Sequence, residues 1–145
     1  MLIYLDNCCY NRPYDDETQM RISLETQAKL YIQDLIKKHE LQLASSFMLL
    51  AENDANPYDI KRSMIRSFIN SHTNIFVGID NLETIKQMAF PIMETGIKQA
   101  DAYHLACAVF THCDYFITTD KRILRYHTDK LKIQNPTVFL AELEE

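Results

Sequence analysis

The chain has 145 residues, of which 47% are hydrophobic and 24% are charged, the balance expected of one domain with a packed core. Its net charge of −5 poorly suits a protein that coats nucleic acid, because phosphate contacts need Lys and Arg. It suits a protein that gathers carboxylates around a cation, or one that meets a basic partner. No apolar run approaches the roughly 20 residues of a membrane helix, and no signal peptide is recognisable. We therefore expect one cytoplasmic domain over residues 1–145, away from membranes.

The cysteines and glycines exclude several classes of site. Cys8, Cys9, Cys107 and Cys113 include no Cys-x-x-Cys pair suited to zinc, so we expect reduced thiols that pack as small apolar side chains. With only two glycines, the chain has no phosphate-binding loop and no dinucleotide fingerprint. It also lacks a Gly-x-Ser-x-Gly motif, so ATPase, dehydrogenase and α/β-hydrolase functions have no support.

In the first half of the chain, strand-like and helix-like patterns alternate. The pattern predicts a strand at 2–6, a loop at 7–15, a helix at about 17–38, a strand at 41–45, helices at about 46–55 and 57–71, and a strand at 74–79. Asp16 is a candidate cap for the first helix. Asn56 is a candidate cap for the third, with Pro57 in its first turn.

The second half continues the alternation. The motif Asp80-x-x-Glu83 resembles a capping box for a helix that reaches about residue 95, and Gly96 suits the position after it. The remaining elements predicted are a helix at about 99–113, a strand at 115–118, a short helix at 120–126, a weak strand near 131–133 and a terminal helix at 138–143. This alternation favours an α/β fold with a mainly parallel sheet.

Four acidic residues fall near expected strand ends or helix starts. Asp6 and Asp120 follow strands, Asp101 begins the helix before the fourth strand, and Glu52 lies on the helix after the second. Ligands of open α/β sheets bind beyond the carboxyl ends of the strands. Clustered carboxylates repel unless a cation neutralises them, and oxygen ligands favour Mg²⁺ or Mn²⁺. One or two such ions lower the pKa of bound water and stabilise charge on a phosphodiester.

Four blocks of the sequence together resemble the PIN-domain family in order and spacing. They are Leu5-Asp6-Asn7, Ser45-Ser46-Phe47-Met48-Leu49-Leu50-Ala51-Glu52, Asp101-Ala102-Tyr103-His104-Leu105-Ala106 and Phe116-Ile117-Thr118-Thr119-Asp120. The stretch 6–16 also resembles a PIN subgroup with an Asn-Arg-Pro loop. The resemblance spans nearly the whole chain. It implies a three-layer α/β/α sandwich with a central, mainly parallel sheet, and metal-dependent cleavage of RNA, best known from VapC-type toxins paired with antitoxins.

Matching positions carry the family's site onto this chain. The resemblance implies that the catalytic, metal-binding acids are Asp6, Glu52, Asp101 and Asp120. It also implies that Thr118 or Thr119 is a polar helper. Asn7 replaces the Ser or Thr of many relatives and retains hydrogen-bonding ability. Lys121 and Arg122 stand where some relatives have a further acid, which weakens a second metal site or brings positive charge to a phosphate. With Arg12, they are candidate RNA contacts.

Other interpretations stay open beside the resemblance. Each Asp is equally a type of residue that caps helices, and Asp54 is the neighbour most easily mistaken for Glu52. His104 is either a general base or, as we favour, a packed and hydrogen-bonded side chain. We expect a metal-dependent endoribonuclease that forms a homo-oligomer and serves as the toxin of an antitoxin pair. The alternatives are an inactive PIN-like module that binds RNA or a protein, and a metal-dependent nuclease for DNA.

Overall fold

Five parallel strands form the centre of the computed structural model, which describes residues 1–11 and 19–144. Their order in the sheet is β3-β2-β1-β4-β5, so the first strand is the middle one. The strands are β1 (Leu2–Leu5), β2 (Gln42–Ser46), β3 (Thr73–Val77), β4 (Tyr115–Ile117) and β5 (Lys132–Gln134). Within the described residues the sheet is entirely parallel, which agrees with the predicted α/β class.

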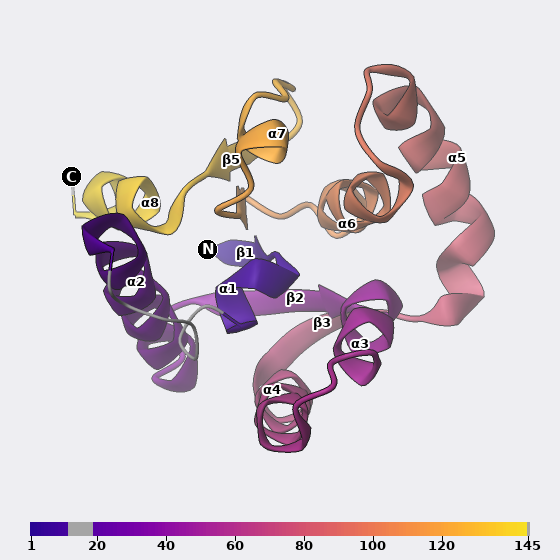
Figure 1. The fold of residues 1–145 in the computed structure, drawn as a ribbon. Coiled ribbons are helices and arrows are strands. Elements are labelled where there is room, and N and C mark those ends of the chain that lie inside the picture. The colour runs from indigo at the N-terminus through magenta and orange to yellow at the C-terminus, as the bar shows by residue number, and fades with distance from the viewer. Residues whose placement is uncertain (12–18, 145) are drawn as a thin grey trace.

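Helices cover both faces of this sheet and complete three layers. Figure 1 shows α2 and α8 on one side of β1 and α5 and α6 on the other. The longer helices are α2 (Met20–Lys37), α3 (Phe47–Asp54), α4 (Asp59–His72), α5 (Leu82–Glu94), α6 (Gln99–Phe110) and α8 (Pro136–Leu143). The shorter ones are α1 (Asn7–Asn11), η2 (Ile79–Asn81) and α7 (Lys121–Leu124). The predicted three-layer sandwich is confirmed.

The central strand β1 is buried on both of its faces. All four of its residues are buried, because helices pack on each side of the sheet. A parallel strand in this position is expected to be apolar throughout rather than alternating. In register, Ile3 lies between Leu43 of β2 and Tyr115 of β4. The carboxyl ends of β1, β2 and β4 therefore meet at one edge of the sheet.

Several local predictions are wrong, each for a reason visible in the backbone. Residues 7–11 form the helix α1 and not a loop, since the Cys9 N–H donates to the Asp6 carbonyl and closes a helical turn. Helix α2 begins at Met20, with Gln19 at its N-cap, and Asp16 and Arg12 lie outside the described residues. Helix α6 ends at Phe110, not near 113, because His112 has a positive φ of 59°.

The predicted helix caps had mixed outcomes. Asn56 caps a turn by accepting from the Tyr58 N–H at 3.0 Å, so α4 begins only at Asp59. The capping box at Asp80 is wrong, because Asp80 lies inside η2 and α5 follows Asn81. Gly96 does follow α5 with φ of 102°, as predicted. Helix α8 starts earlier than predicted because Asn135 caps it, accepting from the Thr137 N–H at 2.8 Å.

The cysteines behave as small packing residues. Cys9, Cys107 and Cys113 are buried, Cys8 is partly buried, and all four are free thiols. Within residues 1–11 and 19–144, no helix has the length and apolar character needed to cross a membrane.

Candidate active site

One threonine hydroxyl connects the acids that follow β1 and β4. Leu5 and Ile117 are paired in register, so the residues after them lie side by side. The Thr118 hydroxyl donates to Asp6 Oδ2 at 2.7 Å and accepts from the Asp120 N–H at 3.0 Å. Both Thr118 and Asp6 are buried. The first and last acids of the predicted site are therefore held together by Thr118.

The remaining oxygen of Asp6 is held by the turn that follows it. The Asn7 N–H donates to Asp6 Oδ1 at 2.8 Å, and the Cys8 thiol lies 3.6 Å from Oδ2. The Thr119 N–H in turn donates to the Cys8 sulfur at 3.4 Å. Of the predicted polar helpers, Thr118 thus contacts the acid through its side chain, whereas Asn7 contacts it through the backbone.

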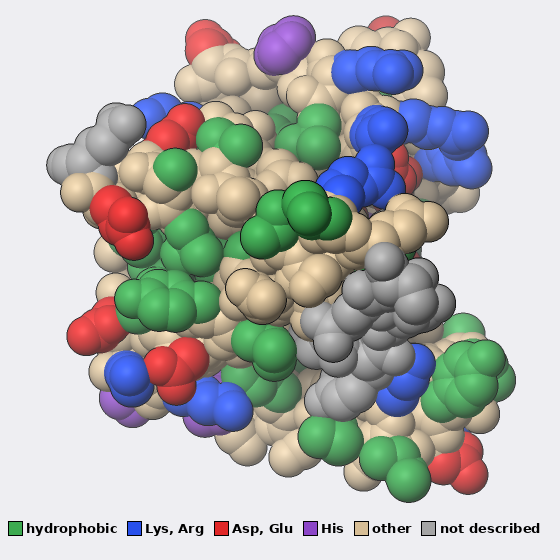
Figure 2. All heavy atoms as spheres, turned by 60° about the vertical axis from the view of Figure 1, so that its left-hand side comes forward, with side chains coloured by type: hydrophobic (Ala, Val, Ile, Leu, Met, Phe, Trp, Pro, Cys, Tyr) green, Lys and Arg blue, Asp and Glu red, His purple; other side chains and the backbone are tan. Residues whose placement is uncertain are grey.

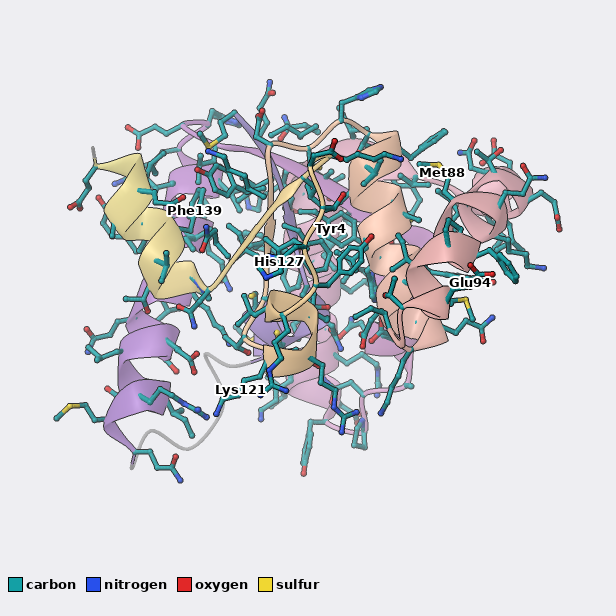
Figure 3. All side chains as sticks on the ribbon, turned by 90° about the horizontal axis from the view of Figure 1, so that it is seen from above. Tyr4, Met88, Glu94, Lys121, His127 and Phe139 are labelled. Atoms are coloured by element: carbon teal, nitrogen blue, oxygen red, sulfur yellow. The ribbon has the colours of Figure 1, made fainter. Side chains whose placement is uncertain are left out.

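Asp120 is both a helix cap and a member of this group. Its Oδ1 accepts from the Arg122 N–H at 2.8 Å and thereby begins α7. Lys121 and Arg122 are exposed on that helix, and Figure 3 shows Lys121 projecting from α7. Lys and Arg side chains gather at the upper right of the face in Figure 2. Asp120 can cap α7 and belong to the site at once, because its Oδ1 caps the helix while its N–H is bonded to Thr118.

The second predicted acid, Glu52, contacts a buried histidine. His104 Nε2 is hydrogen-bonded to Glu52 Oε1, and His104 is 1% exposed. Asp54, two residues later, is instead exposed and ion-paired with Arg66 at 2.7 Å. The helix α3 thus directs Glu52 toward α6 and Asp54 toward solvent.

His104 is a packed and hydrogen-bonded side chain. Its Nδ1 lies 2.7 Å from the Tyr4 hydroxyl, so both ring nitrogens have partners. Burial lowers the pKa of His104, but the hydrogen bond and charge of Glu52, with the charges of Asp6 and Asp101, outweigh burial and raise the pKa. The raised pKa favours the imidazolium form, which donates a stronger hydrogen bond to the Glu52 carboxylate.

Asp101 is the acid on which the negative charges of the other three act. It lies in the first turn of α6, one turn before His104, and Lys98 rather than Asp101 occupies the N-cap. Burial raises the pKa of Asp101, and the negative charges of Asp6, Asp120 and, more weakly, Glu52 raise it further. Asp101 is thus close enough to the other three carboxylates for each to disfavour its ionisation.

The donor set of the candidate site consists of carboxylate oxygens, which suit Mg²⁺ or Mn²⁺. Among the described residues, no three His, Cys, Asp or Glu side chains lie close enough together to form a metal-binding group. The mutual repulsion at Asp101 is nevertheless the kind that a divalent cation relieves, so the residues present fit such an ion in chemistry.

The chain is similar to solved structures in its fold. No family model and no curated protein matches the sequence. Solved structures do match: one is the crystal structure of VapBC2 from Rickettsia felis bound to a DNA fragment from their promoter. That match has 14% identity and a TM-score of 0.57, and it covers 93% of this chain and 98% of that chain. FitAcB from Neisseria gonorrhoeae matches with 17% identity and a TM-score of 0.56 over 92% of this chain and 97% of that chain.

The chain has a PIN-like fold. At these identities the likeness establishes the fold alone. Within the PIN-like fold, sequence reasoning missed the buried hydrogen bonds among Ser46, Tyr4 and His104. The available signal was Tyr4 itself, because a tyrosine in the middle of a buried strand needs a partner for its hydroxyl.

Proposed function

We propose that the protein is a metal-dependent endoribonuclease in which Asp6, Glu52, Asp101 and Asp120 hold Mg²⁺ or Mn²⁺. The observation that carries the proposal is the position of Asp101, whose ionisation is disfavoured by its burial and by the three other carboxylates. A cluster of this kind is unfavourable without a cation, so it is difficult to explain by stability alone.

The bound cation would supply an activated water and would stabilise charge on the phosphodiester. The chain's own residues prepare the site for it. Thr118 and the Asn7 N–H fix both oxygens of Asp6, and the Arg122 N–H fixes one oxygen of Asp120. Lys121 and Arg122, next to the last acid, are suited to contact the RNA backbone.

The biological role that fits this activity is the toxin of a toxin–antitoxin pair. It rests on the family resemblance and on the fold shared with VapBC2. We extend the proposal to a cytoplasmic homo-oligomer of single-domain chains with an antitoxin protein as a further partner.

The proposal is tested by cleavage of a mixed RNA pool with Mn²⁺, with and without chelator. The parent protein should cleave RNA only when metal is present. Asp101→Asn should lose about 100-fold or more of the activity, because several kcal/mol of transition-state stabilisation depend on the metal. Asp80→Asn removes an exposed acid on η2 and serves as the control for net charge.

The outcomes separate the alternatives. Cleavage that survives chelation contradicts a metal mechanism. Cleavage of a parallel DNA pool but not of RNA identifies a DNA nuclease. A folded parent that binds RNA without cleaving either pool is an inactive binding module, and an unimpaired Asp101→Asn protein removes Asp101 from the site.

A further inference from the structure

A continuous set of buried hydrogen bonds leads from the sheet to Glu52. The Tyr4 hydroxyl lies 2.7 Å from Ser46 Oγ and 2.7 Å from His104 Nδ1. The opposite nitrogen of the same imidazole, Nε2, binds Glu52 Oε1. The four residues come from β1, β2, α6 and α3, and we call them the Tyr4 relay.

Every internal member of the Tyr4 relay is buried. Tyr4 and Ser46 are 0% exposed and His104 is 1% exposed, whereas the side chain of Glu52 is 32% exposed. Figure 3 shows Tyr4 beside α6, and its ring stacks on Phe116 of β4 at 5.4 Å. Burial raises the pKa of Tyr4, so its hydroxyl stays protonated. Only the end that carries the carboxylate faces outward.

Ser46 acts on Glu52 by a second route. It is the N-cap of α3, where its Oγ accepts from the Leu49 N–H at 3.4 Å. Glu52 lies on that same helix. The hydroxyl bonded to Tyr4 therefore also sets the start of the helix that carries the acid.

We infer that Tyr4 and His104 are positioning residues that orient the Glu52 carboxylate for the divalent cation. The inference rests on the proposed function. The hydrogen bond from His104 to Oε1 would hold the Glu52 carboxylate in place for the ion and leaves Oε2 outside that bond. Hydrogen-bond partners of this kind fix metal-binding carboxylates, and losing them weakens metal binding about 10- to 100-fold.

Proton positions in the relay are consistent with this role. A neutral His104 donates from Nε2 to Glu52 and accepts at Nδ1 from Tyr4, whose oxygen then accepts from Ser46. A protonated His104 donates at both nitrogens, and Tyr4 donates to Ser46 instead. In each arrangement both ring nitrogens and both hydroxyl oxygens of the relay have a hydrogen-bond partner, and His104 Nε2 donates to Glu52.

The test measures Mn²⁺ binding by calorimetry, independently of RNA cleavage. Tyr4→Phe removes one oxygen and keeps the stacked ring, and it should raise the dissociation constant about 10-fold. The control is Tyr10→Phe, since Tyr10 is also buried but its hydroxyl has no hydrogen-bond partner among residues 1–11 and 19–144. This control should bind Mn²⁺ as the parent does.

A pair of His104 variants separates orientation from packing. His104→Asn keeps a polar group near Tyr4 but is too short to reach Glu52, so it should weaken binding about 10-fold or more. His104→Gln places an amide donor where Nε2 was and should recover part of that loss. If circular dichroism shows that Tyr4→Phe does not fold, the two His104 variants test the positioning role.

Two negative outcomes are distinguishable. If the parent and Asp101→Asn both fail to bind Mn²⁺, the proposed function itself is wrong. If the parent binds Mn²⁺, Asp101→Asn weakens binding, and Tyr4→Phe and His104→Asn both remain within about twofold of the parent, the metal site stands and the positioning role is overturned.

Discussion

At the scale of single residues, the arrangement around Asp6 depends on a hydroxyl. Thr118 donates to Asp6 Oδ2 and accepts from the Asp120 N–H, and it is completely buried. A buried carboxylate that loses a donor retains its desolvation penalty without compensation. Replacing Thr118 by a residue without a hydroxyl would also leave the Asp120 N–H without its acceptor.

We therefore expect Thr118→Val to lower the free energy of unfolding by about 1–3 kcal/mol. Valine has nearly the same shape, so the loss reports the hydroxyl and not a cavity. Thr118→Ser keeps the hydroxyl and should lose less. Urea denaturation with linear extrapolation measures both variants. Equal stabilities of Thr118→Val and the parent would show that the Thr118 bond is unimportant for stability.

Individual site residues were partly predictable. Thr118 and Thr119 could not be separated from sequence, because the strand's alternation decides which one turns toward Asp6 only after the register with β1 is known. Glu52 and Asp54 differ for a similar reason, since the rotation of α3 directs one to His104 and the other to Arg66. Such choices depend on tertiary packing, which sequence patterns do not encode locally.

At the scale of elements, the short helix α7 combines an acid at its cap with exposed cations. Lys121 and Arg122 follow Asp120 directly, and Arg125 lies at the C-cap of α7. In a chain of net charge −5, this cluster offers positive charge beside the proposed site. Each Lys or Arg contact to single-stranded nucleic acid makes the binding constant depend on salt, with a slope of about −0.7 per contact.

Replacing Lys121 and Arg122 by Ala should reduce the salt slope of RNA binding by about 1.4. Binding of a labelled single-stranded RNA is measured by fluorescence anisotropy over a range of NaCl concentrations, with chelator present to prevent cleavage. The control replaces the exposed Lys38 and Lys86, which changes the net charge equally. A slope that falls as much in the control would mean that only overall charge matters.

The elements themselves were mostly predictable, and their ends were not. The five strands and the longer helices follow from runs and spacings of apolar residues. Helix α1 was missed because the polar stretch 7–15, which contains a proline, resembles a loop, whereas the backbone hydrogen bond from Cys9 to Asp6 depends on the strand before it. The Asp80 box failed because a 3₁₀ turn competes for the same residues.

For the molecule as a whole, stability should depend on pH through the clustered acids. The pKa of Asp101 is raised above its ordinary value of 3.8 in the folded state. The folded protein then holds the Asp101 proton more tightly than the unfolded chain does. The contribution of Asp101 to the stability of the folded state is favourable below the ordinary pKa. It is lost as the pH rises through the raised pKa of the folded state.

We expect metal-free Asp101→Asn and the parent to melt at similar temperatures near pH 4 or below. As the pH rises toward about 7, the variant should become the more stable of the two. Saturating Mn²⁺ should remove the advantage, because it stabilises the parent by binding the folded state. Thermal melts at several pH values measure the difference. A constant difference across this range would contradict repulsion at Asp101.

The central place of β1 also governs when the protein can assemble during its synthesis. Ile3 pairs with Tyr115, which the ribosome adds more than a hundred residues later. Contacts between such distant residues form slowly, because a long loop must close first. A nascent chain therefore carries Asp6 and Glu52 well before β4 can pair with β1. Until then Asp6 lacks Thr118, so the first and last acids cannot be held together before residues 118–120 have been synthesised.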